Sequence, residues 1–327
     1  MNNIKSQYKN ILITGGHGFI GSNMLNKYVA SYPNINFINI DIDTYASNPS
    51  NVTIDELDNY KFVRCDIREI VPLEKVFKEY SIDSVIHFAA ESHVDLSITN
   101  PDVFVTTNVN GTHNLLMLAK KYGIKRFHHV STDEVYGELG EVGYFTETTP
   151  LAPNSPYSAS KAGSDMLVRA YHETYELDAV ITRCSNNYGP NQDVTKLIPK
   201  FITNLIKDDN IGLYGKGANI RDWLYVEDHC DAIWTVFNNG LSGSVYNIGG
   251  NTEKTNLEIA RTLLTKLGKS EMKIVYVNDR LGHDFRYAID ASKIKNDLGW
   301  EPKYTFENGI TNTIDFYKSI NKDIINN

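Results

Sequence analysis

Six short apolar runs in the first part of the chain, each followed by a polar turn, set the strongest limit on its fold. Most of them are followed by a longer helical pattern. Strand–helix alternation of this kind predicts an α/β fold, in which a parallel sheet is covered by helices on both faces. Ligands of such sheets bind beyond the carboxyl ends of the strands, so the residues after each run are the first candidates for a site. The runs are residues 11–13, 37–40, 62–63, 85–88, 127–130 and 179–181.

A glycine-rich turn follows the first run and precedes a helical pattern. Gly16, Gly18 and Gly21 match the spacing G-x-G-x-x-G, and Gly15 stands beside them. Glycines at these positions permit a tight turn and a close approach of a pyrophosphate, whose charge is favoured by the N–H groups at the start of a helix. The turn therefore predicts a Rossmann-type domain that binds a dinucleotide.

Asp41 closes the second run, at the distance where an acidic residue accepts the ribose hydroxyls of the adenosine. A carboxylate there would repel a 2′-phosphate, and the next residue, Ile42, offers no cation to hold one. We therefore predict NAD rather than NADP. Asp66, after the third run, suits a hydrogen bond to the adenine amino group and is nearly as well explained as a helix cap.

The pattern changes beyond about residue 188, where Gly- and Asn-rich connections separate shorter helical patterns. We expect a doubly wound NAD-binding Rossmann domain over residues 1–188 and a smaller C-terminal α/β lobe for the substrate over residues 189–327. We also expect the chain to cross back from the second lobe to the first domain.

Composition excludes several classes of partner. The net charge is −8, and no run of Lys and Arg is longer than two residues, so the chain should repel a nucleic acid. The three cysteines are widely spaced and form no C-x-x-C pair, which indicates buried thiols and neither a disulfide framework nor a metal site. Residues 1–10 are polar and no stretch is long enough to span a bilayer, so we expect a soluble, cytoplasmic protein with no membrane partner.

Tyr157 and Lys161 lie four residues apart in a helical pattern, and therefore on one face of the helix. The ammonium is expected to lower the phenol pKa from about 10, so that Tyr157 can act as a general base and acid near neutral pH. Together with the turn at residues 14–21, this pair resembles the extended short-chain dehydrogenase/reductase family that acts on nucleotide sugars. The resemblance implies a homodimer packed through a four-helix bundle and a C-terminal lobe that holds the sugar nucleotide.

Asp133 and Glu134 follow Ser131 and Thr132 at the end of the fifth run. Two acids exceed the needs of hydride transfer, because Tyr157 already serves the hydroxyl that is oxidised. Removal of water from a sugar needs two further groups, a base for a C–H proton and an acid for the departing hydroxyl. The pair therefore indicates a dehydratase, and capping of a helix after the strand is the alternative explanation.

The string around these acids resembles that of the dTDP-glucose 4,6-dehydratases, which are hydro-lyases, and the resemblance extends along almost the whole chain. It implies that Tyr157 and Thr132 act at the C4 oxygen while NAD takes a hydride, that Glu134 takes the C5 proton, and that Asp133 protonates the C6 hydroxyl. The hydride then returns to C6 and gives dTDP-4-keto-6-deoxyglucose, which feeds deoxysugar synthesis such as that of rhamnose. Further matching segments are residues 89–95, 186–190, 196–199, 221–226, 246–250 and 282–287.

Two expectations follow from this chemistry. Asp133 must be protonated at the start, so its pKa should be raised by burial or by the like charge of Glu134. Because the hydride is returned within one turnover, NAD should stay bound as a prosthetic group.

The resemblance also assigns the remaining site residues by position. The catalytic residues are Thr132, Asp133, Glu134, Tyr157 and Lys161. The expected NAD contacts are Gly15, Gly18, Phe19, Ile20, Gly21, Asp41, Asp43, Thr44, Asp66, Ile67, Ala89, Ala90, Glu91, Thr107, Tyr157, Lys161 and Asn187. The expected substrate contacts are Ser92, His93, Thr132, Asn186, Lys196, Leu197, Tyr214, Arg221, Asn256, Arg280 and His283.

Three departures from the dehydratase pattern lie around the substrate. Leu96 stands where the pattern has Arg, residues 191–195 replace a connection with more proline and acid, and Leu281 replaces a proline. These changes leave the cofactor motifs and the Thr132–Glu134 string intact. They leave open whether the base of the substrate is that of dTDP or of UDP.

Two other function classes share part of this machinery. A nucleotide-sugar 4-epimerase or decarboxylase would use the same cofactor with Tyr157 and Lys161, and the Asp133–Glu134 pair is the feature that discriminates against both. A non-catalytic NAD-binding protein could have the same fold, since fold alone does not assign function. The intact Thr132, Tyr157 and Lys161 disfavour that reading.

Overall fold

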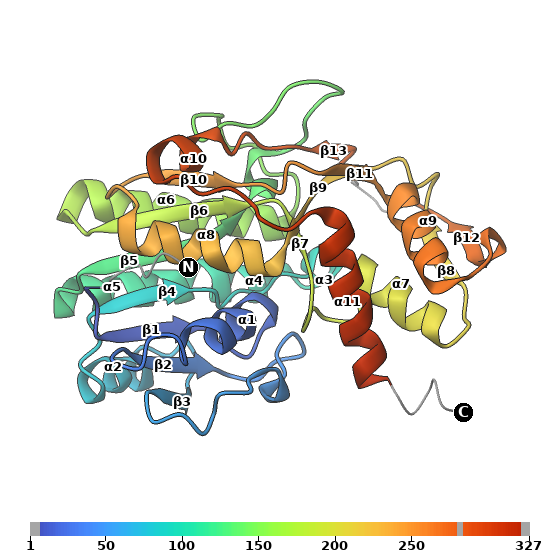
Figure 1. Cartoon of the computed structure of the whole chain (residues 1–327). Helices are drawn as coiled ribbons and strands as arrows, with labels where there is room; N and C mark the ends of the chain where they lie inside the picture. Colours follow the sequence, from blue (N-terminus) through green and yellow to red (C-terminus); the bar gives the residue numbers. More distant parts are fainter. Residues whose placement is uncertain (1–6, 280–283, 322–327) are drawn as a thin grey trace.

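The computed structural model describes residues 7–279 and 284–321. Its centre is a sheet of seven parallel strands in the order β10-β6-β5-β4-β1-β2-β3 (Figure 1). All six predicted runs lie in this sheet, and β10 is a seventh strand that the sequence analysis did not identify. The strands are β1 (Asn10–Thr14), β2 (Asn36–Asp41), β3 (Tyr60–Arg64), β4 (Ser84–His87), β5 (Arg126–Thr132), β6 (Ala179–Cys184) and β10 (Val245–Ile248).

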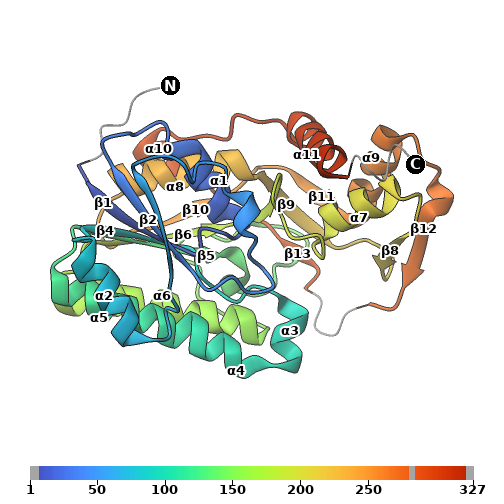
Figure 2. The same ribbon diagram turned by 90° about the horizontal axis from the view of Figure 1, so that it is seen from below.

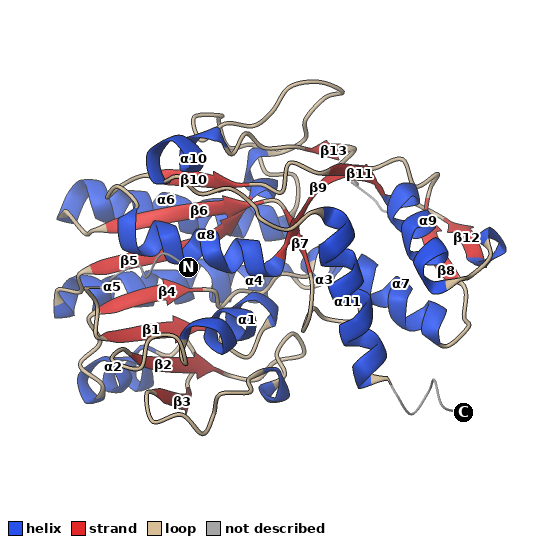
Figure 3. Cartoon of the chain, in the orientation of Figure 1, coloured by secondary structure: helices blue, strands red, loops and turns tan. Residues whose placement is uncertain are grey.

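Helices cover both faces of the sheet, which confirms the predicted α/β architecture (Figures 2 and 3). One layer holds α1 (Phe19–Tyr28), α8 (Val226–Asn239) and α10 (Ser292–Leu298). The other layer holds α2 (Ile70–Glu79), α5 (Thr112–Tyr122) and α6 (Pro156–Tyr175), with α3 (Val94–Thr99), α4 (Pro101–Phe104) and the π-helical segment η2 (Val105–Gly111) beside them.

Alternate residues of each strand feed the two layers, because successive side chains point to opposite faces of a sheet. In β1, Ile11 and Ile13 join the apolar cluster that contains Met24 of α1. Leu12 joins the cluster on the other face, which contains Leu115 of α5. Strands buried on both faces explain why runs such as residues 11–13 and 179–181 are continuously apolar rather than alternating.

The C-terminal part contains two small sheets and three helices. In the first small sheet β9 (Ile220–Tyr225) pairs with β7 (Asn186–Tyr188), β11 (Glu253–Thr255) and β13 (Arg286–Tyr287). The second joins β8 (Ile211–Tyr214) to β12 (Ile274–Val277). The helices of this part are α7 (Leu197–Ile206), α9 (Asn256–Leu267) and α11 (Phe306–Ile320). Elsewhere in the chain, short 3-10 turns are η1 (Pro49–Asn51) and η3 (Asp133–Tyr136), and η4 (Glu271–Lys273) precedes β12.

The chain passes between the two parts more than once. After β9 it forms α8 and β10, which pack on and extend the large sheet, and it then returns to β11. Conversely, β7 ends at Tyr188 and pairs with β9, not with the large sheet. A division of the chain at residue 188 therefore stays a prediction. The strand pairings show that β10, which follows residue 188, belongs to the large sheet, whereas β7, which ends at that residue, belongs to the small sheet.

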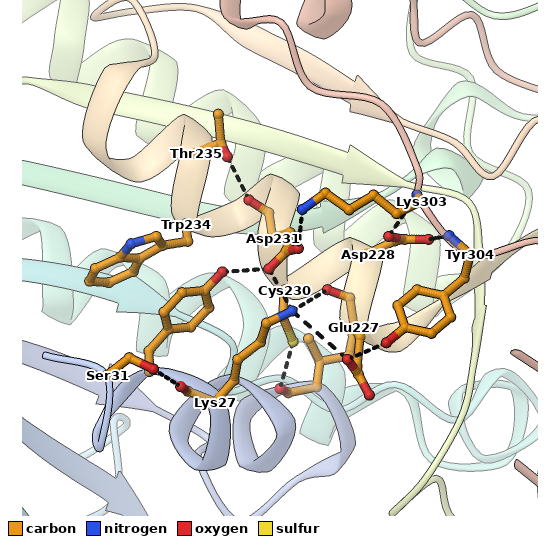
Figure 4. A network of polar contacts seen from close by, with 12 residues as sticks. Lys27, Ser31, Glu227, Asp228, Cys230, Asp231, Trp234, Thr235, Lys303 and Tyr304 are labelled. Carbon is orange, nitrogen blue, oxygen red and sulfur yellow. Dashed lines mark hydrogen bonds and ion pairs between the residues drawn. The ribbon is translucent and has the colours of Figure 1, made fainter. Parts of the chain in front are cut away.

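A network of charged side chains ties α8 to α1 and to the segment before α11 (Figure 4). Asp231 forms ion pairs with Lys27 Nζ at 2.6 Å and with Lys303 Nζ at 3.1 Å. Asp228 accepts the backbone N–H groups of Lys303 and Tyr304, each at 2.9 Å. These contacts fix the chain that leads into α11 against the Rossmann layer, and they lie on the face of the sheet that carries α8.

The structure also bears on the cysteines, on membrane-spanning helices and on metal ligands. Cys65, Cys184 and Cys230 are buried free thiols, as predicted. Residues 7–279 and 284–321 contain no helix long and apolar enough to cross a membrane, and no cluster of side chains in these ranges has the composition of a metal site.

His229 of α8 provides a test of this packing. It is fully buried, neither ring nitrogen has a hydrogen-bond partner among the described residues, and burial lowers its pKa to about 3. The unfolded chain takes up the proton below about pH 6.5 and the fold does not, so this histidine costs stability as the pH falls from there. His229→Leu should therefore stabilise the fold, and by about 1 kcal/mol more at pH 5.5 than at pH 7.5.

Urea unfolding at the two pH values measures this difference. His113→Leu, at a half-buried histidine of α5, is the matched control and should leave the pH dependence near that of the wild type. An unchanged pH dependence in His229→Leu would show that the histidine is hydrated or paired in solution.

Candidate functional site

A single cavity runs along the carboxyl ends of β1 to β6 and holds most of the predicted site residues. Of the predicted NAD contacts, every one except Asp43 lines it. Thr132, which is also a predicted substrate contact, Asp133, Glu134, Tyr157 and Lys161 line it too, as do four further predicted substrate contacts, Ser92, His93, Asn186 and Lys196. The structure therefore brings together residues from six strand ends that are far apart in the sequence.

The glycine turn is shaped for close approach. Gly15 has φ +75°, and a Cβ there would lie 2.7 Å from the Ala89 nitrogen. A Cβ on Gly21 would lie 2.4 Å from the Gly15 oxygen, so α1 could not pack against the turn. Gly18 lines the cavity and is the N-cap residue of α1, and a Cβ there would lie 3.2 Å from the Gly15 oxygen. The turn thus offers the cradle that a pyrophosphate needs.

The acidic residues after β2 have different surroundings. Asp41 lines the cavity and accepts the backbone N–H groups of His17 at 3.1 Å and Asp43 at 3.0 Å, which orient its carboxylate. Asp43 lies outside the cavity lining, and its Oδ1 is 2.6 Å from His17 Nδ1. Asp41 is therefore placed to receive a ribose, whereas Asp43 braces the turn.

Asp66 combines features of both explanations offered by the sequence. It lines the cavity, and its carboxylate also accepts the Arg68 backbone N–H at 2.9 Å and the Arg68 guanidinium at 2.6 to 3.0 Å. Burial raises the pKa of Asp66, but the Arg68 hydrogen bonds outweigh it and lower the pKa overall. Its assignment to the adenine amino group stays a prediction.

The loop after β4 is held by a buried chain of hydrogen bonds. The Ala89 N–H donates to Thr14 Oγ1 at 3.1 Å, and Thr14 Oγ1 lies 2.7 Å from His87 Nδ1. Asn108 of η2 accepts the Glu91 N–H at 2.8 Å and donates to the Glu91 carbonyl at 3.0 Å. Sequence reasoning did not find Asn108 because its position in a helical pattern gives no sign that a loop packs on it.

The Thr132–Glu134 string enters the cavity through the start of η3. Thr132 is the N-cap of this turn, since its Oγ1 accepts the Glu134 N–H at 3.3 Å. Capping therefore falls to Thr132 and does not account for the two acids. Asp133 is 2% exposed, and burial, followed by the charges of Glu134 and Asp222, raises its pKa well above the usual value. This confirms the expectation that Asp133 can hold a proton.

Tyr157 and Lys161 lie in the first turns of α6, which starts with Pro156 and a capping box formed by Ser155 and Ser158. Burial raises the pKa of Tyr157 well above 10, with the Glu134 charge next in size, while a hydrogen bond from Thr132 opposes the rise. The expected lowering by Lys161 is wrong for this structure. The Lys161 ammonium donates to the Val130 carbonyl at 2.9 Å, and burial lowers its own pKa to about 8.

The remaining substrate candidates are placed differently. Lys196 lines the cavity and its ammonium donates to the Ser92 carbonyl at 3.2 Å. Arg221 lies outside the lining, where its guanidinium donates to the Asp284 carbonyl at 2.9 Å and stacks 4.4 Å from the centre of the Tyr287 ring. Leu197, Tyr214 and Asn256 also lie outside the lining, and Arg280 and His283 fall outside the described residues, as does Leu281.

Comparison with known proteins assigns this arrangement to a family. The protein-family model described as GDP-mannose 4,6 dehydratase matches residues 12–313. A dTDP-glucose 4,6-dehydratase of Xanthomonas campestris is 49% identical over 325 residues, covering 94% of this chain and 92% of that protein. The enzyme of the same name from Escherichia coli is 48% identical, covering 94% and 93%. The chain belongs to the dTDP-glucose 4,6-dehydratase family.

Solved structures of this dehydratase family have the same fold. DesIV, a dTDP-glucose 4,6-dehydratase from Streptomyces venezuelae solved with NAD and dTDP bound, aligns with a TM-score of 0.92 at 46% identity, covering 96% of this chain and 98% of that one. UDP-glucose 4-epimerase from Thermotoga maritima aligns with a TM-score of 0.89 at 30% identity, covering 95% and 99%. The fold is thus shared with epimerases, so the fold alone does not separate the two reactions.

Several cavity residues of this dehydratase-family chain were missed by sequence reasoning. Cys184 and Ser185 stand at the end of β6, a few residues after the last predicted run, so inspection of that strand end would have found them. Tyr45 lies beyond Thr44, and its hydroxyl donates to Glu91 Oε2 at 2.8 Å. The other missed residues include Ala46, Ser47, Gln192, Asp193 and Thr195.

Proposed function

We propose that this protein is an NAD-dependent dTDP-glucose 4,6-dehydratase that forms dTDP-4-keto-6-deoxyglucose. The observation that carries the proposal is a buried carboxyl with a raised pKa, Asp133, beside a second acid, Glu134, and the phenol of Tyr157 in one cavity. A redox step alone needs one proton shuttle. This cavity holds three groups that can move protons, which is the number required for oxidation coupled to loss of water.

The cavity residues fit NAD. The Gly15–Gly21 turn leaves room where a Cβ would collide, and Asp41 and Lys161 line the same cavity. The Asn187 side-chain oxygen is buried and has no hydrogen-bond partner among the described residues, so it can accept a bond from a ligand. Bound NAD supplies a hydride acceptor for C4 and, once reduced, a hydride donor for C6.

The chain's own residues move the protons. Tyr157 first loses its own proton, and its phenolate then takes the proton of the C4 hydroxyl. Thr132, which hydrogen-bonds the phenol, contacts the same oxygen. The ketone at C4 makes the C5 proton acidic, and Glu134 removes it. Asp133 donates its proton to the C6 hydroxyl, which leaves as water, and Glu134 then returns a proton to C5.

Product analysis tests this proposal. The protein is incubated separately with dTDP-glucose, UDP-glucose, GDP-mannose and UDP-glucuronic acid, and the products are identified by mass spectrometry and by the alkali-induced absorbance of 4-keto sugars. We expect loss of one water and a 4-keto product from dTDP-glucose. A product isomeric with the substrate would identify an epimerase, and release of carbon dioxide from a nucleotide-sugar acid would identify a decarboxylase.

A second expectation concerns the cofactor. Because the hydride is returned to the sugar, release of the cofactor during turnover would strand the oxidised intermediate. Protein purified without added NAD should therefore carry NAD, detectable by chromatography of the acid-denatured protein. Gly21→Ala, which puts a methyl group against the Gly15 carbonyl, should lose that NAD, whereas Gly140→Ala, at a glycine whose Cβ would meet nothing within 4 Å, should keep it.

The assembly and location are part of the same proposal. We propose a homodimer in the cytoplasm. Exposed apolar side chains support the dimer, because Val105 of η2, Met117 of α5 and Met166 of α6 all lie on the helix layer that α8 does not occupy. Sedimentation at micromolar concentration measures the mass directly.

A further inference from the structure

Lys161 belongs to a buried cluster of ionisable side chains, and none of the proton transfers described above uses this cluster. It consists of Lys161, His129, Asp165 and Arg183, and we call it the interior ion cluster. Asp165 lies one helical turn after Lys161 on α6 and its side chain is 0% exposed. Its Oδ2 accepts Arg183 Nε at 2.8 Å. His129 Nε2 lies 3.4 Å from Asp165 Oδ1 and 3.5 Å from Lys161 Nζ, so this ring nitrogen stands between the carboxylate and the ammonium.

The carboxylate is held from the far side as well. Arg183 Nη1 donates to the Tyr136 hydroxyl at 3.0 Å, and that hydroxyl donates to Asn247 Oδ1 at 2.7 Å. The guanidinium also lies 4.9 Å from the centre of the Tyr136 ring. Asp165 is therefore fixed between α6, β6 and the edge strand β10, with little freedom to move away from Lys161.

Charge balance shows what the carboxylate does for Lys161. The titratable groups around Lys161 are His87 of β4, His129 of β5, Cys184 of β6, and Tyr157 and Asp165 of its own helix. Burial lowers the pKa values of both histidines and raises those of Cys184 and Tyr157, so these four are neutral at pH 7. Burial also raises the pKa of Asp165, but His129 and Arg183 outweigh it and keep it below its usual value. Asp165 is the anion of this group.

We propose that Asp165 is a positioning residue for the hydride-transfer step, which keeps the buried Lys161 side chain charged and directed along the floor of the cavity. The proposal rests on the proposed function, because the step that it supports is the oxidation at C4. A buried ion pair is weak evidence for a role in stability, since apolar residues of similar volume often replace such a pair without loss. Because Asp165 lies one helical turn after Lys161, its negative charge can act on the ammonium, and packing alone does not require a charge at this position.

Asp165→Asn tests the proposal through the pH dependence of turnover. Without the carboxylate, the neutral form of Lys161 is favoured, and an opposite charge at this range is worth about one to three pKa units. The alkaline limb of kcat should move to lower pH by about one unit or more, so that kcat at pH 8 falls roughly fivefold. The matched control is Asp231→Asn, which breaks the network of Figure 4 on the other face of the sheet. It should cost stability and leave the alkaline limb in place.

A second measurement does not depend on turnover. NMR of protein with isotope-labelled lysine follows the titration of Lys161, whose signal is assigned by its absence in Lys161→Met. The pKa of Lys161 should fall in Asp165→Asn and stay unchanged in Asp231→Asn. If Asp165→Asn does not fold, Asp165→Ser removes the same charge without placing an amide against Arg183.

The outcomes separate the two proposals. A Lys161 titration that is the same in wild type and in the Asp165 variant overturns the role of Asp165, whether or not the protein dehydrates a sugar nucleotide. Absence of dehydration by the wild type would overturn the proposed function, while the NMR titration would still decide whether Asp165 sets the charge of Lys161. A kcat loss equal at every pH would identify Asp165 as a structural residue only.

Discussion

Glu134→Gln is expected to stop the reaction after oxidation at C4, with formation of the 4-keto-6-deoxy product reduced by about 10²- to 10⁴-fold. The amide cannot take the C5 proton, while Tyr157 and the cofactor turn are unchanged. Reduced nicotinamide should therefore accumulate and be seen by its absorbance after one addition of dTDP-glucose. Asp133→Asn should lose turnover to a similar extent for a different reason, because the departing hydroxyl then lacks a proton donor.

Solvent isotope exchange separates the two acids. In heavy water, Asp133→Asn keeps Glu134 and should exchange the C5 proton of the oxidised sugar, so that recovered sugar carries deuterium at C5. Glu134→Gln should show no such exchange. Glu141→Gln, at an exposed acid in the segment after η3, is the control and should turn over like the wild type. Undiminished product formation by either site variant would contradict the role assigned to that acid.

The strands and the cavity could be predicted because they depend on short-range patterns. A run such as residues 11–13 is apolar throughout because β1 is buried on both faces, and the polar residues that follow must lie at the cavity edge. β10 was missed for the opposite reason. Val245–Ile248 comes after an excursion into the C-terminal part, and nothing local shows that it returns to pair with β6.

Residues that support the site from behind were also beyond sequence reasoning. Asn108 and Asp165 both stand in helical patterns, where a polar residue is most often exposed to solvent. Only the packing of η2 and α6 against the sheet shows that both side chains are buried and bonded. The predicted lowering of the Tyr157 pKa was wrong for the same reason. The spacing predicts a shared helix face, but it cannot show how deeply the phenol is buried or that Lys161 bonds to Val130.

Tyr157→Phe should block the reaction one step earlier than the Glu134 variant. The phenol is the group that takes the C4 hydroxyl proton, and loss of a general base typically costs about 10²- to 10⁴-fold. No reduced nicotinamide should accumulate, and no deuterium should enter C5, because the ketone that acidifies C5 never forms. Tyr175→Phe, on the exposed part of the same helix, is the matched control and keeps the ring that packs on Lys120.

The two site variants can be combined because they affect steps in sequence. Tyr157 is assigned to the oxidation at C4, and Glu134 acts only on the product of that oxidation. The double variant Tyr157→Phe with Glu134→Gln should therefore form the 4-keto sugar nucleotide no more slowly than Tyr157→Phe alone. A slower oxidation in the double variant would instead show that Glu134 also contributes to the oxidation step. The raised pKa of Tyr157 is caused in part by the Glu134 charge, so removal of that charge should make the phenol easier to ionise. Glu134→Gln should therefore oxidise C4 at a lower pH than the wild type, which single-turnover absorbance measures directly.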